Sequence, residues 1–227
     1  MKKIPKNYLL HTAFTMLELV FVIVVIGILA AAIIPNTKTN PVQEAAIQLI
    51  SHIRYTQHLA MMDDKYNAAD SNWYKGRWQI VFSTSDYTNN VPAYTIFSDA
   101  STYTGDVSES EVAKNPQNIN QIMTGGYGNA ASIDIRNNGF KGMEKLNLGL
   151  SYGITSVTLS AGCSGGSRIS FDYMGRPLKG DHSTMSGPYA AGTQRLITSN
   201  CLITLTNETE NAIITIRPET GYTSVTF

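Results

Sequence analysis

The chain has 227 residues, of which 43% are apolar and only 15% are charged, and its 17 basic and 17 acidic side chains cancel. Zero net charge argues against a generally basic nucleic-acid binder and against an acidic tail protein, although a local basic patch stays open. Two cysteines are too few for a disulfide-rich scaffold or an all-thiolate zinc site. The length suggests one domain, or one domain with an appendage.

The N-terminal end is basic and then strongly apolar. Residues 1–13 carry three lysines and no acid, and the 21 residues of 14–34 contain one charged side chain, Glu18, and no proline. As a helix this run is about 31 Å long, close to the thickness of a bilayer's hydrocarbon core, so we predict a membrane-spanning helix. A secretory signal peptide is the alternative, but the run is longer than a usual signal core, and Glu18 is costly in hydrocarbon without a partner.

The spacing of Phe14, Glu18 and Pro35 around this apolar run resembles the N-terminus of type IV pilins and pseudopilins. The resemblance implies that a prepilin peptidase cuts between Ala13 and Phe14 and that the new N-terminus at Phe14 is methylated. The family prefers glycine at the position of Ala13. The resemblance also implies that the Glu18 carboxylate pairs with the Phe14 ammonium of a neighbouring filament subunit, because two buried charges are tolerated only when they meet. The alternative is that Glu18 lies at the interfacial end of the helix without a role.

An amphipathic helix is predicted over residues 41–66, after a kink between Pro35 and Pro41. Its apolar residues recur at three- and four-residue steps, and they are Val42, Ala45, Ala46, Leu49, Ile50, Ile53, Ala60 and Met61. This stripe is expected to pack against a sheet. Together with residues 14–35 it would form a long kinked spine.

The remaining residues, 67–227, predict a β-rich globular head. Strands are expected at Arg77 to Ser83, Ala93 to Ser98, Ser132 to Arg136, Ile154 to Leu159, Arg168 to Tyr173, Cys201 to Thr206 and Ala212 to Arg217. Residues 98–128 are expected to form a long, partly mobile insertion loop. The predicted fold class is therefore α+β, with a membrane-spanning helical spine packed on an antiparallel sheet. Its parts are the cleaved leader 1–13, the transmembrane or filament-core helix 14–35, the periplasmic half of the spine 36–66 and the head 67–227.

The C-terminal part resembles the GspH/FimT group of minor pseudopilins. The residues that carry this likeness are 171–177 (FDYMGRP), the strand-like runs 202–206 and 212–217, and the terminal 221–223 (GYT). The group has the same order of strand, Gly-Arg-Pro turn, two strands and a glycine near the end. The match is looser than that of the N-terminal motif.

Cys163 and Cys201 both flank predicted strands of the head. The resemblance places the head in the periplasm, where a disulfide can form. A bond between them would close a loop of about 39 residues and stabilise the fold by about 4 kcal/mol in the chain-entropy model. Two reduced, buried thiols are the alternative.

Other motifs carry less weight. Residues 162–166 match the G-x-S-x-G pattern, but the following residues read as a strand rather than the helix of a nucleophile elbow. His52 and His58 lie six residues apart, which puts them on different helix faces and argues against a zinc site. Four acids of one loop could supply oxygens to calcium, although their spacing matches no calcium loop: Asp99, Asp106, Glu109 and Glu111. We predict no enzyme, no cofactor and no metal.

The resemblance implies a structural minor pseudopilin of an inner-membrane-anchored periplasmic pseudopilus, serving type II protein secretion or fimbrial assembly. The chain would cross the bacterial inner membrane once, with its C-terminal head in the periplasm. Its partners would be the prepilin peptidase, other pseudopilins or pilins, and the secretion or uptake machinery. The alternative is a FimT-like DNA-binding minor pilin for natural transformation that uses Arg195 and Arg217. Since residues 163–227 carry five basic and five acidic side chains, we do not expect a nucleic-acid partner.

Overall fold

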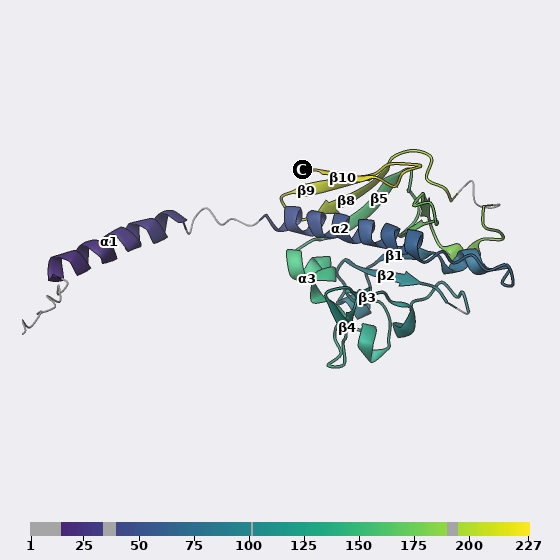
Figure 1. Cartoon of the computed structure of the whole chain (residues 1–227), viewed down its shortest axis with the longest axis horizontal. Coiled ribbons are helices and arrows are strands. Elements are labelled where there is room, and N and C mark those ends of the chain that lie inside the picture. Colours follow the sequence, from purple (N-terminus) through teal and green to yellow (C-terminus); the bar gives the residue numbers. More distant parts are fainter. Residues whose placement is uncertain (1–14, 34–39, 101, 190–194) are drawn as a thin grey trace, which may run out of the picture. The chain divides into compact units, whose positions relative to one another are not determined.

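The computed structural model describes residues 15–33, 40–100, 102–189 and 195–227. The chain divides into two compact units, Met1–Thr39 and Asn40–Phe227. Figure 1 shows helix α1 in the first unit and all the strands in the second. We call the second unit the head and describe each unit by itself.

Helix α1 spans Met16–Ile33 and has 18 residues. At 1.5 Å per residue it is about 27 Å long, shorter than the roughly 30 Å of hydrocarbon in a typical bilayer. Among the described residues, no helix combines the length and the apolar character that crossing a membrane needs. The prediction of a membrane-spanning spine is therefore wrong as a description of this fold, and so is the single-pass inner-membrane location that rested on it.

The described residues of the head form two four-stranded antiparallel sheets and a small hairpin. The first sheet has the order β2-β1-β6-β7, the second has the order β10-β9-β8-β5, and β3 pairs with β4. The strands are β1 Trp78–Ser83, β2 Ala93–Ser98, β3 Lys114–Asn115, β4 Asn118–Ile122, β5 Ser156–Ala161, β6 Arg168–Phe171, β7 Pro177–Lys179, β8 Cys201–Thr206, β9 Asn211–Ile216 and β10 Thr223–Thr226. The short helices are α3 Leu148–Tyr152 and the 3-10 turns η2 Trp73–Gly76, η3 Asp86–Thr88, η4 Glu109–Glu111, η5 Ala131–Ile133, η6 Glu144–Leu146 and η7 His182–Thr184.

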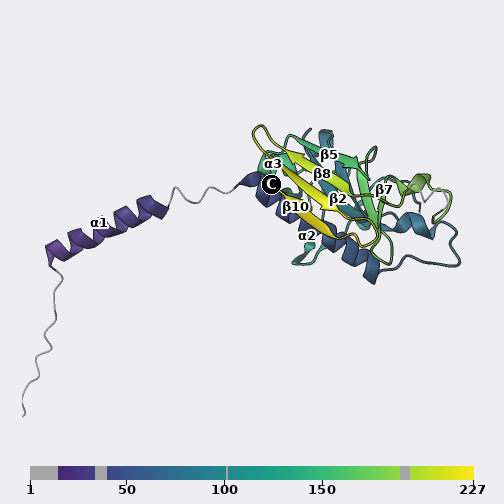
Figure 2. The ribbon, with the colours of Figure 1, turned by 90° about the horizontal axis from the view of Figure 1, so that it is seen from above.

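Helix α2, Pro41–Met62, packs against both sheets. It begins where the Asn40 side chain accepts hydrogen bonds from the amides of Val42 and Gln43, both at 3.1 Å, with Pro41 in the first turn, where a proline is well tolerated. Its apolar stripe packs on β1 and β6 of the first sheet and on β8, β9 and β10 of the second. Figures 1 and 2 show α2 running along the strands of the head. The helix ends at Met62 rather than at residue 66, and the predicted stripe residue Met61 is exposed.

Six of the seven predicted strands lie within a few residues of observed ones. The exception is 132–136, where the alternation of polar and apolar residues belongs to turn η5 and to a local pair in which Arg136 bonds to Asp134. The expected insertion loop 98–128 also differs from the prediction. It contains η4 and the β3–β4 hairpin, and it buries Val107 and Val112 in a small second core.

Candidate assembly surface

Helix α1 exposes its large apolar side chains on every side. Those from Met16 to Leu29 are 38–83% exposed: Met16, Leu17, Leu19, Val20, Phe21, Val22, Ile23, Val24, Val25, Ile26, Ile28 and Leu29. A helix that is apolar all round is stable only when other apolar groups surround it. Contiguous apolar surface of this kind marks an interaction site.

The first turn of α1 is closed by Thr15 and Glu18. The Glu18 amide donates to the Thr15 hydroxyl at 3.2 Å, while the Thr15 amide and hydroxyl lie 3.4 and 3.3 Å from Glu18 Oε2. This reciprocal arrangement is a capping box, which satisfies amide groups that have no partner within the helix. The predicted partner Phe14 lies outside the described residues, as do Ala13 and Pro35.

The predicted disulfide between Cys163 and Cys201 is confirmed. Their Cα atoms lie 4.9 Å apart, and both side chains are fully buried. Cys201 begins β8 and pairs with Ala161 at the end of β5, and Cys163 follows in the next turn. The bond therefore ties the end of the edge strand β5 to the centre of the second sheet.

The two predicted DNA-contacting arginines contact different elements. Arg217 follows β9, is exposed, and lies 5.8 Å from the centre of the Tyr222 ring. Arg195 donates to the Thr184 hydroxyl at 2.6 Å, beside the first sheet. Arg54 was not among the residues predicted from the sequence. Its guanidinium donates to the Thr223 carbonyl at 2.8 Å across 169 positions of the chain, a separation for which the sequence holds no signal.

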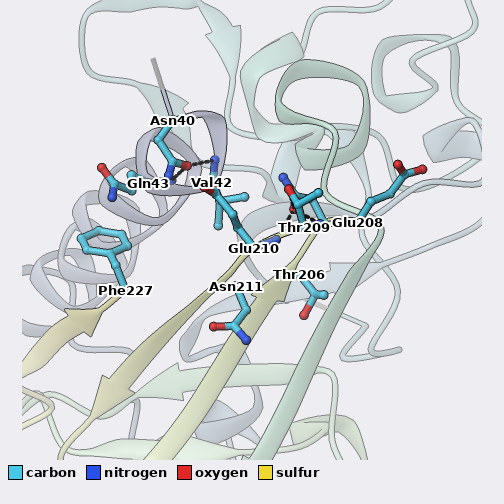
Figure 3. Close-up of a pocket in the computed structure, with 10 residues that line it drawn as sticks. Asn40, Val42, Gln43, Thr206, Glu208, Thr209, Glu210, Asn211 and Phe227 are labelled. Carbon is cyan, nitrogen blue, oxygen red and sulfur yellow. Dashed lines mark hydrogen bonds between the residues drawn. The ribbon is translucent and has the colours of Figure 1, made fainter. Parts of the chain in front are cut away.

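A pocket of about 560 Å³ opens at the end of the head where α2 begins (Figure 3). Its wall contains two exposed carboxylates, Glu208 and Glu210, and the 56%-exposed ring of Phe227. The other lining residues are Asn40, Val42, Gln43, Thr206, Asn207, Thr209 and Asn211. The site is thus acidic on one side and apolar on another, and it joins α2 to the β8–β9 turn.

The described part of the head buries one serine–histidine pair. Ser170 Oγ lies 2.7 Å from His182 Nε2, and both residues are fully buried. Burial lowers the pKa of His182 to about 3, with the positive charges of Arg77 and Arg195 acting in the same direction. A serine beside a histidine is the starting arrangement of a nucleophile and its base, but full burial leaves this pair without access for a substrate. It serves as a polar contact between β6 and η7.

A second buried polar cluster closes the turn after β6. The Asp172 carboxylate, 1% exposed, accepts from Arg176 Nε at 2.8 Å and from the Tyr189 hydroxyl at 3.2 Å. The hydrogen bond to Asp172 raises the pKa of Arg176 above its ordinary value. Arg77 lies over the ring of Tyr189, at 4.9 Å from its centre. These contacts orient the Gly-Arg-Pro turn that the sequence analysis singled out.

Three of the four loop acids considered for calcium have hydrogen-bond or ion-pair partners within the protein. Asp99 Oδ2 accepts from the Gly105 amide, Glu109 pairs with Lys141, and Glu111 accepts from the amide and hydroxyl of Ser108. Within the described ranges, no group of three or more histidine, cysteine or acidic side chains has the geometry of a metal site.

No family model matches the chain, and comparison with curated proteins and with solved structures found no match either. The likeness to pseudopilins therefore rests on the sequence motifs alone.

Proposed function

We propose that the chain is a structural subunit of a pilin-like filament, serving protein secretion or fimbrial assembly. The observation that carries this proposal is the exposed apolar surface of α1 on all of its faces. Copies of such a helix can cover one another in a bundle, and 18 residues provide five turns for packing. The compact head with its own disulfide supplies a stable outer part for each subunit.

In this proposal Glu18 sets the register between neighbouring subunits. After cleavage between Ala13 and Phe14, the ammonium group of Phe14 in one subunit meets the Glu18 carboxylate of another. A slipped subunit would leave one of the two charges bare among the apolar side chains of the helices, which is strongly unfavourable. The prepilin peptidase and other pilin-like subunits are the expected partners.

The test uses the full chain, produced together with a prepilin peptidase and observed by negative-stain electron microscopy. Val24→Asp places a charge on α1, whereas Leu150→Asp places the same charge on α3 of the head. The two side chains are 52% and 53% exposed, so the pair is matched. We expect filaments from the wild-type chain and from Leu150→Asp but none from Val24→Asp. Equal assembly of both variants, or no assembly of the wild type, would contradict the proposal; the mass of the mature N-terminus shows whether each chain was processed.

The second candidate is DNA binding by the head. Arg54 donates to the Thr223 carbonyl and Arg217 lies over the Tyr222 ring, so the two arginines and the tyrosine make a small basic and aromatic surface. Arg195 is not part of it. A DNA receptor should bind duplex at about 50 mM salt and lose affinity steeply as salt rises. We expect only weak non-specific binding, and a gel shift abolished by Arg217→Ala would favour this candidate.

A further inference from the structure

The two hairpin turns of the second sheet lie at opposite ends of β9. Residues 207–210 connect β8 to the start of β9, and residues 217–222 connect the end of β9 to β10. We call 217–222 the knob and the pocket around 207–210 the socket. The six residues of β9 separate them by about 20 Å.

Helix α2 links the same two ends. Asn40 and Gln43 line the socket, while Gln57 contacts the knob by donating to the Thr220 carbonyl at 2.8 Å. The 14 helical steps from Gln43 to Gln57 span about 21 Å, in agreement with the length of β9. Knob and socket are therefore held at a fixed spacing by a helix and a strand that pack on each other.

The knob carries the side chains that dominate protein interfaces. Tyr222 is 55% exposed, and the exposed Arg217 lies over its ring; tyrosine and arginine are among the commonest hot-spot residues. The turn is rigid, because Arg217 and Tyr222 are joined by a backbone hydrogen bond of 2.9 Å. Gly221 has a φ of +63°, and a Cβ atom there would lie 2.6 Å from the backbone carbonyl oxygen of Gly175, so only glycine fits.

The socket has the complementary charge. Glu208 and Glu210 are exposed, and neither takes part in an ion pair among the described residues. The Asn207 side chain fixes the turn by accepting from the amides of Thr209 and Glu210 at 2.9 and 2.8 Å. The pocket volume of about 560 Å³ lies within the range of sites that enclose a small molecule, roughly 300–1,000 Å³.

The knob itself carries one basic side chain, Arg217, and one acidic side chain, Glu219, and both are exposed. The exposed Arg54 of α2 lies beside the knob, where it donates to the Thr223 carbonyl, so this end of the head has two basic side chains and one acidic one. At the socket end Glu44, in the first turn of α2, adds to the two acids of the turn. One end is thus basic and aromatic, and the other is acidic with an exposed phenylalanine.

We propose that the knob of one copy of this chain inserts into the socket of the next copy. This inference rests on the proposed function and names the contact by which heads would associate along a filament. Two different surfaces meet, so the contact is heterologous. A repeated heterologous contact builds an open filament, or a ring when the rotation between copies brings the last copy back to the first. Arg217 of one copy meets Glu208 and Glu210 of the next, and Tyr222 meets the ring of Phe227.

The first test is a charge swap in the full chain, followed by sedimentation and electron microscopy. Glu210→Lys and Arg217→Glu should each weaken association about tenfold, because like charges then face each other. The double variant Glu210→Lys/Arg217→Glu should restore it. Glu144→Lys and Lys145→Glu, exposed residues of the η6 region, make the same charge changes elsewhere and should assemble as the wild type does. Arg54 is left unchanged because it holds the start of β10.

The second test does not depend on filaments. A chain with Thr209→Cys is mixed with a chain with Tyr222→Cys, and disulfide-linked pairs are counted after mild oxidation. We expect pairs between the two different chains, and few between Thr209→Cys and the control Leu150→Cys. Such pairs without filaments would support the knob contact and count against the proposed function. Filaments without such pairs, or a charge swap that fails to restore assembly, would overturn the knob contact alone.

Discussion

The side-chain amide of Gln57 donates to the carbonyl of Thr220 at 2.8 Å and also to the carbonyl of Gly175 at 2.8 Å. Thr220 belongs to the β9–β10 turn of the second sheet, and Gly175 to the β6–β7 turn of the first. One residue of α2 therefore connects a turn from each sheet. The hydrogen bond to Thr220 fixes the position of the knob relative to α2.

Gln57→Glu should destabilise the head, because a carboxylate keeps the size of the side chain but cannot donate to either carbonyl. Losing two hydrogen bonds at a partly buried site costs about 1–3 kcal/mol. Chemical denaturation of the purified protein measures this. The control is the exposed neighbour His58: because it lies on the surface, His58→Gln should change the free energy of unfolding by less than about 0.5 kcal/mol. An unchanged stability in Gln57→Glu would show that the two bonds contribute nothing.

Removal of the disulfide should lower stability substantially. The bond joins residues 38 positions apart, and its loss costs about 2–5 kcal/mol in small domains. We expect Cys163→Ala/Cys201→Ala to unfold at a lower urea concentration than the wild type. A reductant should lower the midpoint of the wild type but not that of the double variant. Equal midpoints for oxidised and reduced wild type would contradict this expectation.

The sequence predicted the elements whose pattern is local. Residues 93–98 and 201–206 are short apolar or alternating runs between turn residues, and both became strands with the expected bounds. The apolar stripe of α2 follows a helical period, so its buried face could be identified. In each case neighbouring residues carry the whole signal.

The sequence could not predict features that depend on distant residues. Ser132 and Ile133 alternate in polarity as in a strand, but the segment pairs with no strand among the described residues and forms a 3-10 turn instead. The socket consists of the start of α2, the β8–β9 turn and Phe227, which no spacing rule connects. The membrane prediction was wrong because it assumed a helix over the whole apolar run 14–34, whereas the described helix α1 has 18 residues and no described helix is long and apolar enough to span a membrane.

Acid should destabilise the head through His182. Burial lowers its pKa in the folded state to about 3, whereas an unfolded histidine titrates near about 6.5. Below that pH the unfolded chain binds more protons than the folded one, so the free energy of unfolding falls as the pH drops from about 6.5 toward about 3. The stability from this group is fully present above the unfolded pKa.

His182→Gln should flatten this dependence, because glutamine can still bond to Ser170 and does not titrate. The measurement is urea denaturation between about pH 7.5 and pH 4.5, a range that includes the unfolded pKa and in which the stability from this group falls. Some acid sensitivity should remain, since burial also lowers the pKa of His52 to about 4. His58→Gln is the matched exposed control and should retain the wild-type slope. If His182→Gln also keeps the wild-type slope, His182 is not the cause of the loss of stability in acid.

The mature chain should begin at Phe14 and carry a methylated N-terminus. This expectation follows from the pilin-like motif, and it concerns residues outside the described part of the chain. Mass spectrometry of the protein from cells that contain a prepilin peptidase measures it directly. A chain that starts at Met1 in such cells, or one that starts near residue 33, would contradict the resemblance.

Glu18 has one observed role and one proposed role: its carboxylate completes the capping box with Thr15, and we propose that it also pairs with Phe14 of another subunit. A glutamine at this third helical position can still complete the capping box, since either Glu or Gln serves there. Thr15→Ala does the opposite, because it removes the hydroxyl cap and keeps the carboxylate. The two variants therefore divide the helix-capping role from the charge role.

If the charge sets the register, Glu18→Gln should be processed normally and keep its helix but fail to form regular filaments. Thr15→Ala should lose about 1 kcal/mol of helix stability and still assemble, since its carboxylate can meet the neighbouring ammonium. Glu18→Ala removes both functions and should be the most defective of the three. Circular dichroism reports the helix, mass spectrometry the cleavage, and electron microscopy the filaments. Normal filaments from Glu18→Gln together with poor ones from Thr15→Ala would reverse the assignment, because capping would then be the only role of this residue.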